Sequence, residues 1–240
     1  MARKQVRRIA VRLICGKTPD STGLKLSLVD SASIVLLVGA TVLTVVVVNR
    51  ELTERATPQG IVRVVPSAEV SLVGQRIGSP EAPLTIVVFG DFQCQYCAAA
   101  QGLIKAVLAE YPESVAFRFR HLPLETIHPY AWTAALAAEC AGDQGRFPEY
   151  HDLLYALQDS IGRIAWTDLA ARAGVPSVLA FARCLADETH TDAVERDVRT
   201  ARSLGVNGTP AFILGDELIP GLPPVAWFER RVERAFRKVK

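Results

Sequence analysis

The chain has 240 residues, a length that suits one ordinary domain with extra segments or two small domains. Half of its residues are hydrophobic and 22% are charged, which supports a packed core and excludes a chain that is disordered throughout. The formal net charge is +2, but basic residues crowd the N-terminus and the remainder of the chain is acidic on balance. A basic nucleic-acid-binding face on the main domain is therefore not expected.

An apolar segment without charged residues follows the basic N-terminus, over residues 31–48. At about 1.5 Å per helical residue it comes close to a bilayer core of about 30 Å. Positive charge favours the cytoplasmic side of a membrane. We therefore expect residues 1–30 in the cytoplasm, one transmembrane helix over residues 31–49, and the rest of the chain on the extracytoplasmic side of the cell membrane.

A cleaved signal peptide is the alternative for this segment. Such a peptide has a short basic region, an apolar region of about 7–15 residues and a cleavage site with small residues directly after it. Here the basic region is long, and Asn49-Arg50-Glu51 follows the apolar run, so an uncleaved anchor is favoured. Cys15 is expected to be a reduced cytoplasmic thiol without a role, and residues 50–77 to form a tether.

A strand, a helix and a second strand are predicted in succession after the tether. Residues 84–90 form a compact, β-branched apolar run, typical of a strand buried on both faces. Helical periodicity follows over residues 97–111, and residues 115–121 alternate apolar and polar side chains as a strand does. The result is a βαβ unit in which Cys94 and Cys97 lie at the start of the helix.

The remaining chain is predicted to be mostly helical before it ends in a hairpin and a last helix. Short strands at residues 211–214 and 217–219 are joined by the turn Gly215-Asp216. Helices are expected near residues 129–141, 147–158, 166–173, 176–187 and 190–203, and from residue 223 to about 237.

Cys94 and Cys97 are the candidate catalytic residues. At a helix start, unpaired N–H groups and the helix dipole stabilise a thiolate, the form that attacks a disulfide or leaves from one. We expect Cys94 to be the exposed sulfur with the low pKa, and Cys97 the more buried resolving sulfur. The alternatives are an inert disulfide or half of a zinc site. No metal site is expected, because zinc needs two further ligands and Cys140 and Cys184 do not form a close pair.

Four motifs together resemble the thioredoxin superfamily and, within it, the DsbA-like thiol–disulfide oxidoreductases. The motifs are FGDFQCQYC at residues 89–97, His128-Pro129, QGRF at residues 144–147 and LGVNGTPAF at residues 204–212. The resemblance covers residues 78–237, and we expect the domain to run from 78 to 240. It implies an α/β thioredoxin fold with a helical insertion at about residues 122–200.

The resemblance also implies the roles of several site residues. The Thr209–Pro210 bond is expected to be cis and to lie opposite Cys94, so that the backbone of Thr209 pairs with an extended substrate. The expected substrate-binding residues are Thr209, Pro210, Gln95 and Tyr96. Some members of the family have a second disulfide, expected here between Cys140 and Cys184. Gln95 stands where the family often has proline, which leaves the redox potential open.

We expect a membrane-anchored oxidase that introduces disulfides into exported proteins, needs no cofactor and is reoxidised by a membrane redox partner. Two alternatives stay open: a reductase or isomerase that uses the same cysteines, and a membrane-anchored peptide-binding protein with a vestigial dithiol. Alkylation of the native thiols would distinguish an oxidase from a reductase or isomerase, since an oxidase holds its cysteine pair mainly oxidised. Full function without Cys94 and Cys97 would favour the second.

Several other side chains are candidates for a role near the cysteines or in the core. Asp91 could shuttle a proton for Cys97, although a solvated or capping carboxylate is the favoured interpretation. The four histidines follow no ligand spacing and are expected to be structural or exposed. Four aromatic residues could line a groove but are expected to pack in the core: Trp132, Phe147, Tyr150 and Trp166.

Overall fold

The computed structural model describes residues 28–55, 63–64, 70 and 72–239. The chain divides into two units, Met1–Thr53 and Glu54–Lys240. Helix α1 (Leu28–Arg55) makes up the described part of the first unit and continues into the second. Most of the predicted cytoplasmic segment, including Cys15, lies outside the described residues.

Helix α1 covers the segment for which an anchor is predicted. Among the described residues, no helix is long and apolar enough to cross a bilayer. The transmembrane helix expected over residues 31–49 is therefore not confirmed.

The second unit is built on a six-stranded mixed sheet with the strand order β1-β6-β5-β3-β4-β2. The central strands β3 and β4 are parallel and are joined by helix α3, and the other neighbouring pairs are antiparallel. This confirms the predicted βαβ unit. The strands are β1 (Arg63–Val64), β2 (Gln75–Gly78), β3 (Leu84–Gly90), β4 (Val115–His121), β5 (Ala211–Leu214) and β6 (Glu217–Pro220), and helix α3 is Gln95–Glu110.

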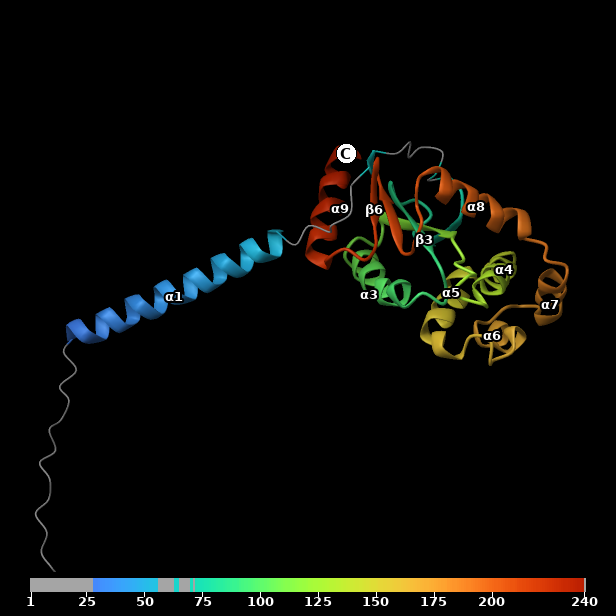
Figure 1. The fold of residues 1–240 in the computed structure, drawn as a ribbon, viewed down its shortest axis with the longest axis horizontal. Helices are drawn as coiled ribbons and strands as arrows, with labels where there is room; N and C mark the ends of the chain where they lie inside the picture. The colour runs from blue at the N-terminus through green and yellow to red at the C-terminus, as the bar shows by residue number, and fades with distance from the viewer. Residues whose placement is uncertain (1–27, 56–62, 65–69, 71, 240) are drawn as a thin grey trace, which may run out of the picture. The chain divides into compact units, whose positions relative to one another are not determined.

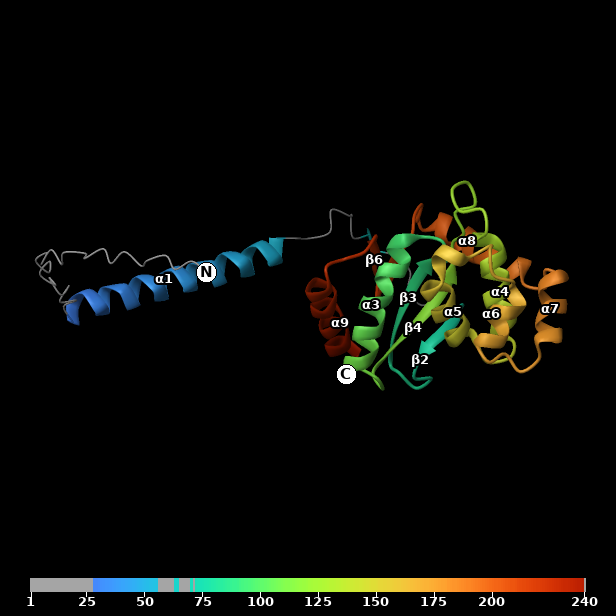
Figure 2. The same ribbon diagram turned by 90° about the horizontal axis from the view of Figure 1, so that it is seen from below.

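Strand β3 is buried on both faces, as its apolar sequence predicts. Alternating side chains point to opposite faces of a sheet. Ile86 and Val88 therefore belong to one apolar cluster, with α3 and α9, whereas Val87 and Phe89 belong to another, with α8. Figures 1 and 2 show α3 and α9 on one side of the sheet and α8 on the other.

The helical insertion lies between β4 and β5 and gathers beside the sheet (Figure 2). The predicted helices are confirmed, with ends within two residues of those expected. They are α4 (Ala131–Gly142), α5 (Phe147–Ala156), α6 (Trp166–Arg172), α7 (Val178–Ala186), α8 (Thr191–Ser203) and the C-terminal α9 (Val225–Val239), with the short 3-10 helix η1 (Gln158–Ser160) after α5. A disulfide joins Cys140 on α4 to Cys184 on α7, with 5.9 Å between the Cα atoms.

Two strands lie in the segment predicted to be a tether over residues 50–77. Strand β2 pairs antiparallel with β4, and β1 pairs with the edge strand β6. The sequence of β2, Gln-Arg-Ile-Gly, lacks the apolar alternation by which a strand is recognised. Its pairing depends instead on long-range contacts, such as the 2.6 Å hydrogen bond from Gln75 Nε2 to Glu139 Oε2 on α4.

Candidate active site

Cys94 is the N-cap residue of α3, at the turn where β3 gives way to the helix. Its backbone is extended, with φ −77° and ψ 119°, and its carbonyl accepts hydrogen bonds from the N–H groups of Cys97 at 3.0 Å and Ala98 at 3.1 Å. The side-chain amide of Gln158 donates to the same carbonyl at 3.0 Å, and to that of Phe92 at 2.7 Å. These hydrogen bonds hold the backbone of Cys94 at the helix N-terminus, and both Cys94 and Cys97 are free thiols.

The loop before β5 lies against the Cys94 sulfur. The Thr209–Pro210 bond is cis, and the Cys94 sulfur lies 3.3 Å from the Thr209 carbonyl oxygen, to which its protonated form donates a hydrogen bond. The structure therefore brings together the cysteine and the proline motif that the sequence places far apart. Cys94 is only 6% exposed, so the expectation of an exposed sulfur is wrong, because the proline loop lies against its sulfur and Gln158 of η1 against its carbonyl.

The two thiols differ sharply in acidity. A hydrogen bond from the Cys97 thiol is the largest cause that lowers the pKa of Cys94 to about 5, against the opposing effect of burial. The side chain of Thr209 and hydrogen bonds from the backbone of Cys97 and Tyr96 lower it further. Burial, and then the hydrogen bond to Cys94, raises the pKa of Cys97 far above its ordinary value. At neutral pH Cys94 is a thiolate and Cys97 a thiol.

The side chain of Thr209 adds to this asymmetry. Its hydroxyl is buried and makes no hydrogen bond of ordinary geometry to the residues that the structure describes. It nevertheless lies close enough to both sulfurs to lower the pKa of Cys94 and of Cys97. Thr209 therefore acts on the cysteines through its side chain as well as its backbone.

Asp91 is buried rather than solvated, with 2% of its surface exposed. Its Oδ1 accepts a hydrogen bond from the Gln93 N–H at 2.7 Å, so it caps the turn before Cys94. Its Oδ2 accepts one from the Leu124 N–H and lies 2.8 Å from Nδ1 of His128. The carboxylate thus ties the cysteine turn to the segment after β4. The backbone of Asp91, by contrast, acts on Cys97 and lowers the pKa of that thiol, against the larger effect of burial.

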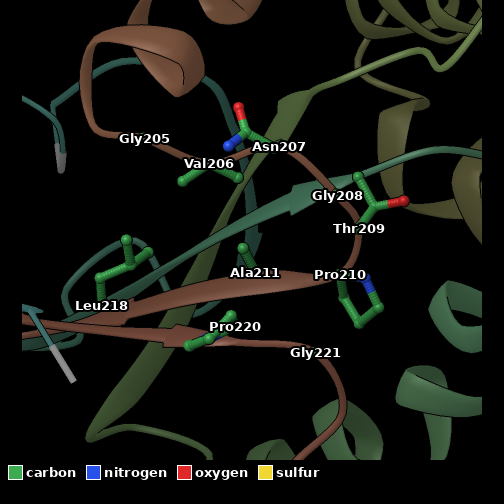
Figure 3. Close-up of a pocket in the computed structure, with 10 residues that line it drawn as sticks. All are labelled: Gly205, Val206, Asn207, Gly208, Thr209, Pro210, Ala211, Leu218, Pro220 and Gly221. Atoms are coloured by element: carbon green, nitrogen blue, oxygen red, sulfur yellow. The ribbon is translucent and has the colours of Figure 1, made fainter. Parts of the chain in front are cut away.

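A pocket of about 420 Å³ lies along the proline loop and the neighbouring hairpin (Figure 3). Thr209 and Pro210 line it, together with the apolar side chains of Val206, Ala211 and Leu218. Gln95 and Tyr96 do not line this pocket, and Tyr96 is 69% exposed on the first turn of α3. The predicted substrate-binding residues therefore fall into two groups, one in the pocket and one on the surface of the helix.

Two residues near the cysteines were missed in the sequence. Gln158 holds the carbonyls of the cysteine turn, and the Tyr155 hydroxyl donates to the carbonyl of Asp91 at 3.4 Å. Both come from the end of α5 and the start of η1, where the sequence pattern indicates only an amphipathic helix. No local signal separates them from ordinary core or surface residues.

The histidines and aromatic residues take structural positions. His121 and His151 are buried, and Phe147 and Tyr150 pack in the main core as expected. Ligand atoms of Cys140, Cys184 and His190 lie within 4.8 Å of one another. The two sulfurs are joined in the disulfide, so in this state the group offers a metal only one free ligand.

Comparison with known proteins places this geometry in a family. The family model described as Thioredoxin matches residues 71–234. A periplasmic thioredoxin-like protein from Salmonella enterica serovar Typhimurium is 30% identical, with a TM-score of 0.56 over 68% of this chain and 89% of that one. A thioredoxin-like oxidoreductase from Silicibacter pomeroyi is 27% identical, with a TM-score of 0.59 over 68% and 92%. BdbD from Bacillus subtilis shares the fold, with a TM-score of 0.63 at 21% identity over 73% and 98%.

Curated relatives include much longer proteins. The Na(+)/H(+) antiporter NhaA 3 of Salinispora tropica is 41% identical over 137 residues, which are 57% of this chain but 21% of the antiporter. NhaA 1 of Salinispora arenicola is 40% identical over the same shares of the two chains. The chain thus spans only about a fifth of these relatives. With the family match over most of its length, and with two free cysteines at the start of α3 beside a cis proline, this chain belongs to the thioredoxin family.

Proposed function

We propose that this chain is a membrane-anchored oxidase that introduces disulfides into exported proteins through Cys94 and Cys97. The observation that carries the proposal is the acidity of Cys94, whose pKa is about 5 at the start of α3. A stabilised thiolate favours the reduced pair over its disulfide, so that the disulfide readily accepts electrons from a substrate. The same property would make a reductase less effective.

The proposed reaction has two exchange steps. A substrate thiolate attacks the Cys94 sulfur of the Cys94–Cys97 disulfide, a mixed disulfide forms, and Cys97 leaves as a thiolate. A second substrate thiolate then attacks the substrate sulfur of the mixed disulfide and displaces Cys94. The substrate gains a disulfide and the enzyme gains two electrons. A membrane redox partner would remove these electrons and restore the Cys94–Cys97 disulfide.

Substrate binding is proposed at the proline loop. An extended chain can pair with backbone groups beside a cis proline, and side chains next to the reacting cysteine can enter an apolar pocket. Thr209 and Pro210 lie at that position, beside the pocket of about 420 Å³. The exposed side chains of Gln95 and Tyr96 would contact the substrate from the other side of the Cys94 sulfur.

The proposed location is the extracytoplasmic side of the cell membrane, with residues 31–49 as the anchor. Support comes from the uncharged apolar run, the basic residues before it and the positive-inside rule. The Cys140–Cys184 disulfide also suits an oxidising compartment, and the Salmonella relative is described as periplasmic. In intact cells, a membrane-impermeant thiol reagent should label reduced Cys94 but leave Cys15 unlabelled until the cells are lysed. Labelling of Cys15 in intact cells would refute this orientation.

Two measurements test the activity itself. Cys94→Ser should abolish oxidation of a reduced, unfolded substrate by the purified full chain, whereas Cys15→Ser should retain it. Rapid alkylation of cells with a mass tag should find the Cys94–Cys97 pair mainly oxidised. A mainly reduced pair would favour a reductase or isomerase, and activity in Cys94→Ser would exclude disulfide exchange at this site.

A further inference from the structure

The exchange reaction places negative charge on a sulfur that the fold buries. Cys97 is 2% exposed and lies in the main apolar core beside Phe92 and Ile104. When it leaves from a disulfide or attacks one, its sulfur carries charge at that position. A buried anion is costly unless hydrogen-bond donors face it. The donors around Cys97 therefore influence the rate in both directions.

The Tyr155 hydroxyl reaches this place from α5. It donates to the carbonyl of Asp91 at 3.4 Å, which is long for a hydrogen bond between oxygens. The same carbonyl accepts the N–H of Cys94 at 3.1 Å, so the hydroxyl lies at the turn that carries the cysteine pair. Burial is the largest cause that raises the pKa of Tyr155, and charge on Cys97 and a hydrogen bond to its side chain raise it further.

The tyrosine ring is fixed in this position. Its centroid lies 5.1 Å from that of Phe92 and 5.0 Å from that of His151, which meets it edge-on. Gly90 leaves room for the hydroxyl, since a Cβ at this glycine would lie 3.1 Å from the tyrosine oxygen. The weak bond to Asp91 and the fixed ring together leave a donor that can turn toward a neighbouring anion.

We propose that Tyr155 is a catalytic residue whose hydroxyl donates a hydrogen bond to the Cys97 sulfur as that sulfur becomes a thiolate. This inference rests on the proposed disulfide exchange but not on its direction. A reaction and its reverse share one transition state, so the same hydrogen bond assists Cys97 as leaving group and as nucleophile.

The hydroxyl acts as a donor and does not transfer its proton. Burial raises the pKa of Tyr155 well above its ordinary value, so the O–H stays intact at neutral pH. When Cys97 attacks, its proton goes to solvent, the Cys97–Cys94 bond forms, and the bond from Cys94 to the substrate sulfur breaks. The charged or titratable groups that act on Tyr155 are Asp91 and the two cysteines, and the His151 ring lies against it.

A two-phase reaction separates the two cysteines. The full chain in a Cys15→Ser background, with only the Cys94–Cys97 pair reduced, is mixed with an aromatic disulfide that releases a coloured thiolate. Attack by Cys94 releases one thiolate, and attack by Cys97 on the mixed disulfide releases the second. In Tyr155→Phe the first phase should be unchanged and the second should slow about tenfold or more, the effect of one lost hydrogen bond to a charged group. In Tyr155→Phe, the rate of the second phase should also begin to rise at a higher pH than it does in the unsubstituted protein.

Tyr150→Phe is the matched control, because Tyr150 is a buried tyrosine on the same helix whose hydroxyl donates to the carbonyl of Trp166 at 3.3 Å. It should leave both phases unchanged. An unaltered second phase in Tyr155→Phe, or equal slowing in Tyr150→Phe, would overturn the role of Tyr155. A normal first phase in each variant shows that the site is folded. Absence of the first phase in the unsubstituted protein would instead refute the proposed exchange activity.

Discussion

Below pH 5 the reduced protein should lose the stability that the Cys94 thiolate gives it at neutral pH. The pKa of Cys94 is lowered from 9.0 to about 5, so the folded state binds fewer protons than the unfolded state between these values. Stability from a lowered pKa is present at higher pH and is lost as the pH falls through the folded value. At pH 7 the contribution is about 3 kcal/mol, because two pH units separate pH 7 from the folded pKa. At about pH 4 it is close to zero, since the thiol is protonated in both states.

Urea unfolding of the reduced protein and of Cys94→Ala, at a series of pH values from 4 to 7, measures this contribution. The difference in unfolding free energy between the two proteins should grow by about 3 kcal/mol toward pH 7 in favour of the unsubstituted protein. The other titrating groups are the same in both proteins, so their contributions cancel in the difference in unfolding free energy. The oxidised protein, which has no Cys94 thiol, should follow the pH dependence of Cys94→Ala. Parallel stability curves for the reduced protein and Cys94→Ala would refute the lowered pKa.

The same free energy sets the redox potential. Stabilising the reduced pair by about 3 kcal/mol makes its disulfide more oxidising by about 60 mV than a pair with ordinary thiols. Equilibration with glutathione over the same pH range should show this shift, which supports the oxidase direction.

Three further predictions concern single features of the structure. Cys97→Ser should trap substrates as mixed disulfides, which non-reducing gels would resolve as adducts that disappear with reductant. Replacing Cys140 and Cys184 by alanine should lower the unfolding free energy by up to about 4 kcal/mol, from the loop entropy of their separation of 44 residues; an unchanged denaturation midpoint would contradict this. Gly90→Ala should cost about 1–3 kcal/mol of unfolding free energy, because the added Cβ would lie 2.5 Å from the ring of Phe119. Gly102→Ala is the control: its added Cβ would meet nothing within 4 Å, so it should not destabilise the protein in the same denaturation assay.

The sequence by itself determined the βαβ unit, the succession of helices and the place of the cysteine pair. These features depend on local periodicity. The apolar run of β3, the alternation in β4 and the helical pattern of the insertion each indicate their structure within a few residues. The cysteine spacing at the helix start likewise predicted which sulfur has the lower pKa, because unpaired N–H groups at a helix start are a local property.

Only the tertiary structure decided which residues surround the two sulfurs. Gln158 approaches Cys94 from η1, Tyr155 approaches from α5, and the Asp91 carboxylate lies against His128. The proline loop meets Cys94 across 115 positions of sequence, and only the family resemblance had placed it there. The burial of Cys94 and the pairing of β2 have the same origin. Such contacts follow from how helices pack on the sheet, and residues that make them carry no local pattern that sets them apart. The sequence thus specified the reactive pair, whereas packing specified the donors that control its charge.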